Sequence, residues 1–183
     1  VLTSVGTSFE NIRLLRETAD KARMEKELET AKHVQNTMFP ASSLRWGSTA
    51  IESFYEPAAE CGGDWWGALP LPGGRLVVAI GDATGHGVPS ALLTASARAT
   101  FSVLEAIVQR DSPKAASPAL ILQLLNRAVR DSAKGKILMT MFVATIHTET
   151  GETVVANASH DPVYRITPEG EMNIVEVPPG HRL

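Results

Sequence analysis

The sequence has little of several features that define large classes of protein. It contains one cysteine, Cys61, in 183 residues, so an internal disulfide is excluded and a reducing compartment is favoured. It contains no apolar run of about 18 residues and no secretory signal pattern, so we expect no membrane segment in this chain. Its net charge is only −3, which argues against nucleic acid or an anionic membrane as a partner. Together these absences predict a cytoplasmic protein.

The residues that are present indicate a packed domain preceded by a different kind of segment. Hydrophobic residues make up 44% of the chain, which is enough to build a core. The length of 183 residues fits one domain with an appended segment. Residues 9–40 contain no glycine and, before Pro40, no proline, and they are rich in good helix formers. Their apolar residues recur at spacings of three and four. This pattern predicts a long helix with a narrow apolar stripe, ended by Pro40.

Two interpretations of this helix are open: it packs on its own domain, or it forms a two-stranded coiled coil with a second copy. We favour the coiled coil, and therefore a homodimer through the N-terminal helix. The opening residues VLTSVGTSFEN are not typical of a natural start, so we expect a fragment of a longer protein. In this hypothesis residues 1–40 are a signalling helix that follows an upstream sensor domain, and residues 41–183 are the next domain.

The rest of the chain alternates between strand and helix patterns. Predicted strands cover residues 48–58 and hairpins at 64–82, 139–159 and 163–177; predicted helices cover 88–109 and 118–132. This order favours an α+β fold with helices packed on antiparallel sheet. The predicted buried stripes of the two helices are Val88, Leu92, Ala95, Ala99, Val103 and Ala106 in the first, and Ala119, Leu122, Leu125 and Val129 in the second.

Two aspartates mark the open end of the hairpin at 64–82. A turn centred on Gly73 places Asp64 directly opposite Asp82, where Cβ atoms lie about 4.5–5.5 Å apart and like charges repel. The local sequence around the two aspartates offers no Lys or Arg to compensate their charge. Either one carboxylate is protonated or a cation lies between them. Hard divalent ions such as Mg²⁺ and Mn²⁺ take carboxylate oxygens as ligands.

Glycines flank both aspartates. Gly62 and Gly63 precede Asp64, and Gly85 and Gly87 follow Asp82, so backbone can approach an ion or a phosphate closely. The alternative is that these are ordinary turn glycines at the end of a hairpin. The symmetric pair of aspartates makes the site interpretation the stronger of the two.

Three blocks of sequence then carry a resemblance to a known family. They are VQNTMFP, CGGDWWGALPLPGGRLVVAIGDATGHGVPSALL and MTMFVATIHTETGETVVANASHDPVYRI. In this order they resemble the PPM-type metal-dependent protein serine/threonine phosphatases, in the bacterial SpoIIE-like branch of sporulation and stress-response partner-switching enzymes. The resemblance covers residues 31–183. It implies a four-layer α-β-β-α sandwich of antiparallel sheets, here C-terminally incomplete and preceded by the long coiled-coil helix.

The resemblance also implies a chemistry. Asp64, Asp82 and the backbone carbonyl of Ala83 match metal ligands of the family, which holds two Mn²⁺ or Mg²⁺ ions. The implied reaction is hydrolysis of phosphoserine or phosphothreonine by a metal-activated water, with no catalytic nucleophile from the protein. The usual partner in this branch is a small phosphorylated STAS-type (anti-anti-sigma) protein.

Departures from the family pattern limit this assignment. No residue after Asp161 matches the family's further metal aspartates, so we expect the fragment alone to be weak or inactive. Thr84 stands where some branches have a histidine that acts as general acid, so His86 receives no such role. His160 and Asp161 are interpreted as turn residues or, alternatively, as substrate contacts. The alternative function is a pseudophosphatase, a non-catalytic module that dimerises in signalling.

Overall fold

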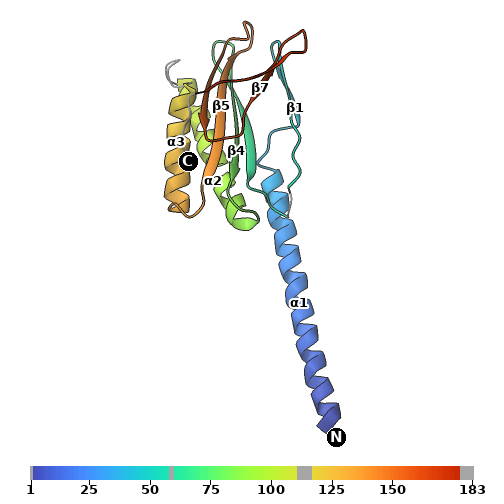
Figure 1. Ribbon diagram of the computed structural model, residues 1–183. Coiled ribbons are helices and arrows are strands. Elements are labelled where there is room, and N and C mark those ends of the chain that lie inside the picture. The colour runs from blue at the N-terminus through green and yellow to red at the C-terminus, as the bar shows by residue number, and fades with distance from the viewer. Residues whose placement is uncertain (1, 58–59, 111–116, 178–183) are drawn as a thin grey trace.

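The computed structural model describes residues 2–57, 60–110 and 117–177, and its elements follow the predicted alternation of strands and helices (Figure 1). The helices are α1 (Leu2–Asn36), α2 (Val88–Arg110) and α3 (Pro118–Ala133). The strands are β1 (Ser43–Trp46), β2 (Thr49–Glu52), β3 (Asp64–Leu71), β4 (Arg75–Ala83), β5 (Met139–His147), β6 (Thr153–Ala158), β7 (Tyr164–Ile166) and β8 (Met172–Ile174). None of the helices in these ranges has the length and apolar character needed to cross a membrane.

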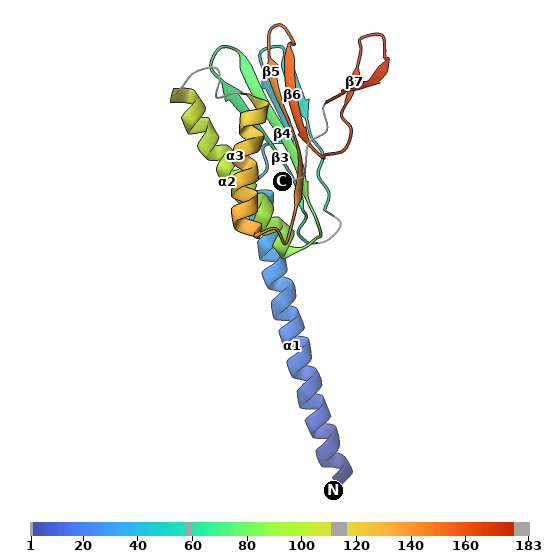
Figure 2. The same cartoon turned by 60° about the vertical axis from the view of Figure 1, so that its left-hand side comes forward.

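The long helix α1 projects away from the rest of the chain (Figure 2). Most of its side chains between residues 10 and 34 are exposed, including Leu15 at 69% and Met24 at 63%. Its last turn is different, because Gln35 is buried and the chain then tightens into turns up to Phe39. The ring of Phe39 lies 4.3 Å from that of Tyr55, centroid to centroid, so α1 is attached at its C-terminal end.

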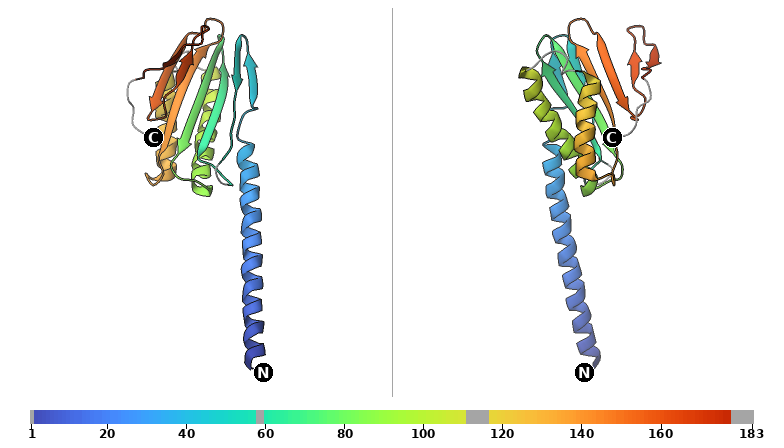
Figure 3. Two further views of the ribbon diagram at one scale, coloured as in Figure 1. Left: turned by 45° about the vertical axis from the view of Figure 1, so that its right-hand side comes forward. Right: turned by 90° about the vertical axis from the view of Figure 1, so that its left-hand side faces the viewer.

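Strands β3, β4, β5 and β6 form one antiparallel sheet in that order, with α2 and α3 on one face (Figure 3). The hairpins β1–β2 and β7–β8 flank the opposite face, and a pocket of about 1010 Å³ lies between them and the sheet. This confirms the predicted mixed fold with antiparallel sheets and an N-terminal helix. Of the four expected layers, the described residues supply one helix layer, the central sheet and two separate hairpins beyond it.

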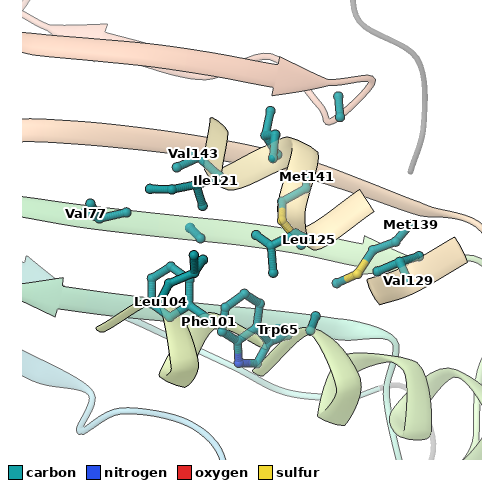
Figure 4. Close-up of a cluster of buried hydrophobic side chains, with 14 of the residues drawn as sticks. Trp65, Val77, Phe101, Leu104, Ile121, Leu125, Val129, Met139, Met141 and Val143 are labelled. Carbon is teal, nitrogen blue, oxygen red and sulfur yellow. The ribbon is translucent and has the colours of Figure 1, made fainter. Parts of the chain in front are cut away.

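The core lies between the sheet and the two helices (Figure 4). Trp65 of β3 and Phe101 of α2 meet edge to face, with ring centroids 5.3 Å apart. Leu125 and Val129 of α3 are fully buried against this cluster. Leu122, Leu125 and Val129 were predicted correctly, whereas Ala119 is exposed and Ile121 takes its place in the core.

The predicted buried stripe of α2 was wrong. Leu92 is 67% exposed and Val103 59% exposed, and the core takes Leu93, Phe101 and Leu104 from the adjacent face. Both faces of this helix are apolar, so its periodicity fits either one. The face with Phe101 removes more apolar surface from water, because the predicted stripe is half alanine.

One local prediction also changed. Of the single strand expected at 48–58, only Thr49–Glu52 form a strand, β2, which pairs with β1 in a hairpin that turns at Gly47 with φ +56°; residue 58 lies outside the described residues. Pro70, whose missing N–H would favour a bulge in a central strand, leaves the pairing of β3 regular: it faces Leu76 without a break. The reason is that β3 is an edge strand, where the missing N–H of proline need not serve a neighbour.

Candidate metal centre

Asp64 and Asp82 lie directly opposite each other across β3 and β4, as the position of the turn predicted. The next pair on the same face is Trp66 with Ile80, and this face points away from α2 and α3. Strand β5 fixes Asp82 from its other side by pairing it with Thr140. The sheet therefore holds the two carboxylates in register at the open end of the hairpin.

A pocket of about 420 Å³ contains both carboxylates. Aromatic side chains and the three polar residues Glu56, His160 and Asp161 surround them, and none of the lining residues in the described part of the chain is Lys or Arg. The lining comprises Phe39, Phe54, Tyr55, Glu56, Asp64, Trp65, Trp66, Ile80, Asp82, His160 and Asp161. The site is therefore an acidic pair at an aromatic pocket without a permanent cation.

The pKa of Asp82 reflects this lack of compensation. Partial burial raises the pKa of Asp82 above its usual value, and the neighbouring charge of Asp64 raises it further. His160 opposes this shift and Asp161 adds to it. The side chain of Asp82 is still exposed to solvent, so its raised pKa belongs to a pair of neighbouring carboxylates at the surface and not to a fully buried charge. A cation bound between the carboxylates would neutralise the charge of Asp64, which is the second cause of the raised pKa of Asp82.

Gly63 packs against the third predicted ligand. The carbonyl oxygen of Gly63 accepts a 2.9 Å hydrogen bond from the N–H of Ala83. A Cβ placed on Gly63 would lie 2.4 Å from the carbonyl oxygen of Ala83 and 3.1 Å from Oδ1 of Asp82. Only glycine fits here, which keeps the Ala83 carbonyl and the Asp82 carboxylate side by side. Ala83 itself is buried, with 1% exposure.

These residues fit part of a divalent metal site. Two carboxylates and a backbone carbonyl are hard oxygen donors of the kind that Mg²⁺ and Mn²⁺ take. Across the described ranges, however, no group of three or more His, Cys, Asp or Glu side chains is arranged to hold a metal. Asp64, Asp82 and Ala83 can therefore supply some ligands of an octahedral ion, and water or other groups must supply the rest.

His160 lies beside the acidic pair, on a constrained loop after β6. Its Nδ1 is 2.9 Å from Oγ1 of Thr140, the residue paired with Asp82. Asn157 holds the backbone of His160 by accepting from its N–H at 2.7 Å and donating to its carbonyl at 3.1 Å. Ser159 between them has φ +54°. The turn interpretation is thus supported by Asn157, and the pocket position keeps the substrate-contact interpretation open.

Residues other than His86 hold the loop between β4 and α2, and His86 itself is exposed. The N–H of Gly87 donates to the carbonyl of Cys61 at 3.1 Å, and Thr84 exchanges hydrogen bonds with Leu138. Cys61 is buried, and burial raises the pKa of its thiol, as expected for an unreactive cysteine.

Sequence reasoning did not single out Glu56, which lines the pocket, or Gln35, which supports the site. Gln35, at the end of α1, makes two hydrogen bonds to the backbone of Gly62. It lies within VQNTMFP, one of the blocks that carry the resemblance, but nothing in the helix periodicity distinguishes it from its neighbours.

Comparison with known proteins decides the family. The family model described as "Stage II sporulation protein E (SpoIIE)" matches residues 72–183. The chain belongs to this family. The match confirms the resemblance to the SpoIIE-like branch that the sequence blocks indicated.

Two relatives of this SpoIIE-family chain are phosphatases by name. It is 24% identical over 162 residues to the phosphoserine phosphatase RsbU of Bacillus subtilis (strain 168). This match covers 88% of this chain and 45% of RsbU. The chain is 29% identical over 107 residues to the phosphoserine phosphatase RsbP of the same organism, covering 58% of this chain and 25% of RsbP. The chain thus spans less than half the length of these relatives.

Solved structures support the fold of the SpoIIE-family chain. The SiaA-PP2C domain of Pseudomonas aeruginosa superposes with a TM-score of 0.58 at 22% identity, over 76% of this chain and 55% of that one. The RsbU and RsbW domains of Rv1364c from Mycobacterium tuberculosis give a TM-score of 0.53 at 28% identity, over 65% of this chain and 32% of that one. The first likeness shows the fold alone.

Proposed function

We propose that this chain carries part of a divalent-metal-dependent phosphatase domain that hydrolyses phosphoserine or phosphothreonine on a regulatory protein. The observation that carries the proposal is the pair Asp64 and Asp82, opposed across β3 and β4 without a permanent cation. Membership of the SpoIIE family and two relatives named as phosphoserine phosphatases support the reaction class.

In this proposal Asp64, Asp82 and the carbonyl of Ala83 hold Mn²⁺ or Mg²⁺, with two ions in the complete centre. When bound, such ions lower the pKa of water and neutralise charge on phosphoryl oxygens. The protein's own part is to hold the ligands: β4 fixes Asp82 between β3 and β5, and Gly63 keeps the Ala83 carbonyl close to it. Trp66, which is buried, lines the pocket beside the pair.

The partners follow from the same family membership. We propose a phosphorylated STAS-type protein as the substrate and a cytoplasmic setting. We also propose that α1 (within residues 1–40) joins an upstream sensor domain to the phosphatase part (41–183) and forms a homodimer. The exposed apolar side chains of α1, such as Leu15 and Met24, support a helix that needs a partner.

The direct test is Mn²⁺ binding followed by titration calorimetry. We expect binding to this chain, weak because few ligands are present, and its loss in both Asp64→Asn and Asp82→Asn. Asp131→Asn is the matched control, since Asp131 is an exposed aspartate on α3. Binding that survives both site substitutions would exclude this pair as the metal ligands.

A non-catalytic signalling module, a pseudophosphatase, is the second candidate. It is favoured by the absence, in the ranges that the structure describes, of any group of three or more His, Cys, Asp or Glu side chains arranged to hold a metal ion. Hydrolysis of p-nitrophenyl phosphate with and without Mn²⁺ separates the two. If the protein is an enzyme, its full-length form should show Mn²⁺-dependent turnover, whereas a pseudophosphatase should show none. This chain by itself should stay near background in both cases.

A further inference from the structure

We propose that Gln35 is a positioning residue of the metal centre: its side-chain amide fixes the loop that carries Gly62 and Gly63 into β3. The inference rests on the proposed function, because it concerns the ligands assigned there. It adds a residue from α1, outside the hairpin that supplies those ligands.

The amide of Gln35 acts on Gly62 as a neighbouring strand would. Its Nε2 donates to the carbonyl of Gly62 at 2.8 Å, and its Oε1 accepts from the N–H of Gly62 at 3.1 Å. The side chain is buried, at 4% exposure, and Nε2 also lies 3.3 Å from Oγ1 of Thr94 in α2. One amide therefore satisfies both backbone groups of Gly62, which would be costly to leave unpaired in a buried position.

Gly62 is restrained on its other side as well. A Cβ on Gly62 would lie 2.5 Å from Oη of Tyr55 and 3.2 Å from Cβ of Pro57. The peptide is thus held between Tyr55 and Gln35. Removing the Gln35 amide releases one of these two restraints.

The loop leads directly to the ligands. Gly63, the next residue, packs on the Ala83 carbonyl and receives the hydrogen bond from the Ala83 N–H. Asp64 follows and begins β3. A shift of Gly62 therefore changes the spacing between Asp64 and the Ala83 carbonyl. Because β3 is an edge strand among the residues that the structure describes, no further strand there corrects that shift.

Attachment of α1 does not depend on Gln35 alone. Phe39 stacks on Tyr55, and Nε of Arg98 in α2 donates to the carbonyl of Met38 at 3.0 Å. These contacts anchor the end of the helix whether or not the amide is present. The specific consequence of losing the amide therefore falls on the loop and on the ligands.

The test uses Gln35→Met, which keeps the length of the side chain and removes both hydrogen bonds to Gly62. Gln123→Met on the exposed side of α3 is the matched control. Two quantities are measured in the whole chain well below its melting temperature: amide exchange of Gly62 and Gly63, and Mn²⁺ affinity from paramagnetic broadening of amide signals. Asp64→Asn is run alongside to verify the metal site.

We expect Gln35→Met to speed exchange at Gly62 and to weaken Mn²⁺ binding about tenfold, as for other groups that orient metal ligands. Gln123→Met should change neither. Unchanged Mn²⁺ affinity in Gln35→Met, with binding still lost in Asp64→Asn, would overturn this inference and leave the metal site standing. Binding that survives Asp64→Asn, or its absence from the unsubstituted chain, would overturn the metal site and this inference with it.

If Gln35→Met fails to fold, Gln35→Asn decides. Asparagine keeps the amide group, but its side chain is one methylene shorter and cannot reach both backbone groups of Gly62. We expect Mn²⁺ affinity between those of the unsubstituted chain and Asp64→Asn. An affinity equal to that of the unsubstituted chain would overturn the inference.

Discussion

Replacement of Gly63 by alanine tests the packing of the site with the smallest possible change. The added methyl would lie 2.4 Å from the Ala83 carbonyl oxygen and 3.1 Å from Oδ1 of Asp82. The first contact is with backbone, which cannot rotate away as a flexible side chain can. The start of β3 must therefore move away from the end of β4.

The cost of this movement follows from the contacts it breaks. Overpacking in a well-packed region costs about 1–3 kcal/mol. Loss of the 2.9 Å hydrogen bond from Ala83 to Gly63 adds about 0.5–1.5 kcal/mol if the strands separate fully. We expect a loss of about 2 kcal/mol in the free energy of unfolding, or about 4–8 °C in melting temperature for a chain of this size.

The assay for Gly63→Ala is thermal and urea unfolding followed by circular dichroism, together with Mn²⁺ affinity. Gly135→Ala is the control: Gly135 has φ +73°, and an added methyl would meet no atom within 4 Å, so the change adds strain without a clash. That change should cost about 1 kcal/mol and leave Mn²⁺ affinity unchanged. A Gly63→Ala chain as stable as the unsubstituted one, with equal Mn²⁺ affinity, would refute the packing argument.

Three further predictions follow from other parts of the structure. In the metal-free chain the pKa of Asp82 is higher in the native state than in the unfolded state, so between these two pKa values the native state binds more protons. The free energy of unfolding should therefore fall as pH rises through that window, and Asp82→Asn should abolish this contribution to the slope. Leu93→Ala should cost about 2–5 kcal/mol in urea unfolding and Leu92→Ala less than about 0.5 kcal/mol, with equal costs contradicting the observed orientation of α2. Light scattering should give the mass of a dimer for the whole chain and of a monomer after deletion of residues 1–30, and a monomeric whole chain would exclude the coiled coil.

The register of the acidic hairpin could be predicted from sequence because it depends on local geometry alone. A two-stranded antiparallel ribbon with a known turn has one pairing, so the position of Gly73 determined that Asp64 faces Asp82. Helical spacing also predicted three buried residues of α3, Leu122, Leu125 and Val129, although Leu120 and Leu124 of the same helix are exposed at 39% and 37%.

The face of α2 and the role of Gln35 could not be predicted, for different physical reasons. In α2 nearly every position is apolar or small, so several stripes are compatible with a helix on a sheet, and only the fit of Phe101 against Trp65 selects one. Gln35 is separated from Gly62 by 27 residues and contacts only backbone atoms there. Backbone partners leave no complementary side chain in the sequence, so no pattern of residue types reveals the contact.

Several contacts restrain the backbone around Asp64 and Asp82, and the position of this acidic pair at the open end of the hairpin explains why they are needed. Hairpin ends open most readily, and two like charges directly opposed push the strands apart. Asp82 withstands this because β5 pairs with it, but Asp64 starts a strand that has no second neighbour within the described part of the sheet. Its position depends on the Gly63–Ala83 hydrogen bond and on the hold of Gln35 on Gly62. A cation between the carboxylates would turn their repulsion into a further restraint. In the proposed function, metal binding and ordering of the start of β3 would therefore reinforce each other, and Gln35 would connect the end of α1 to both.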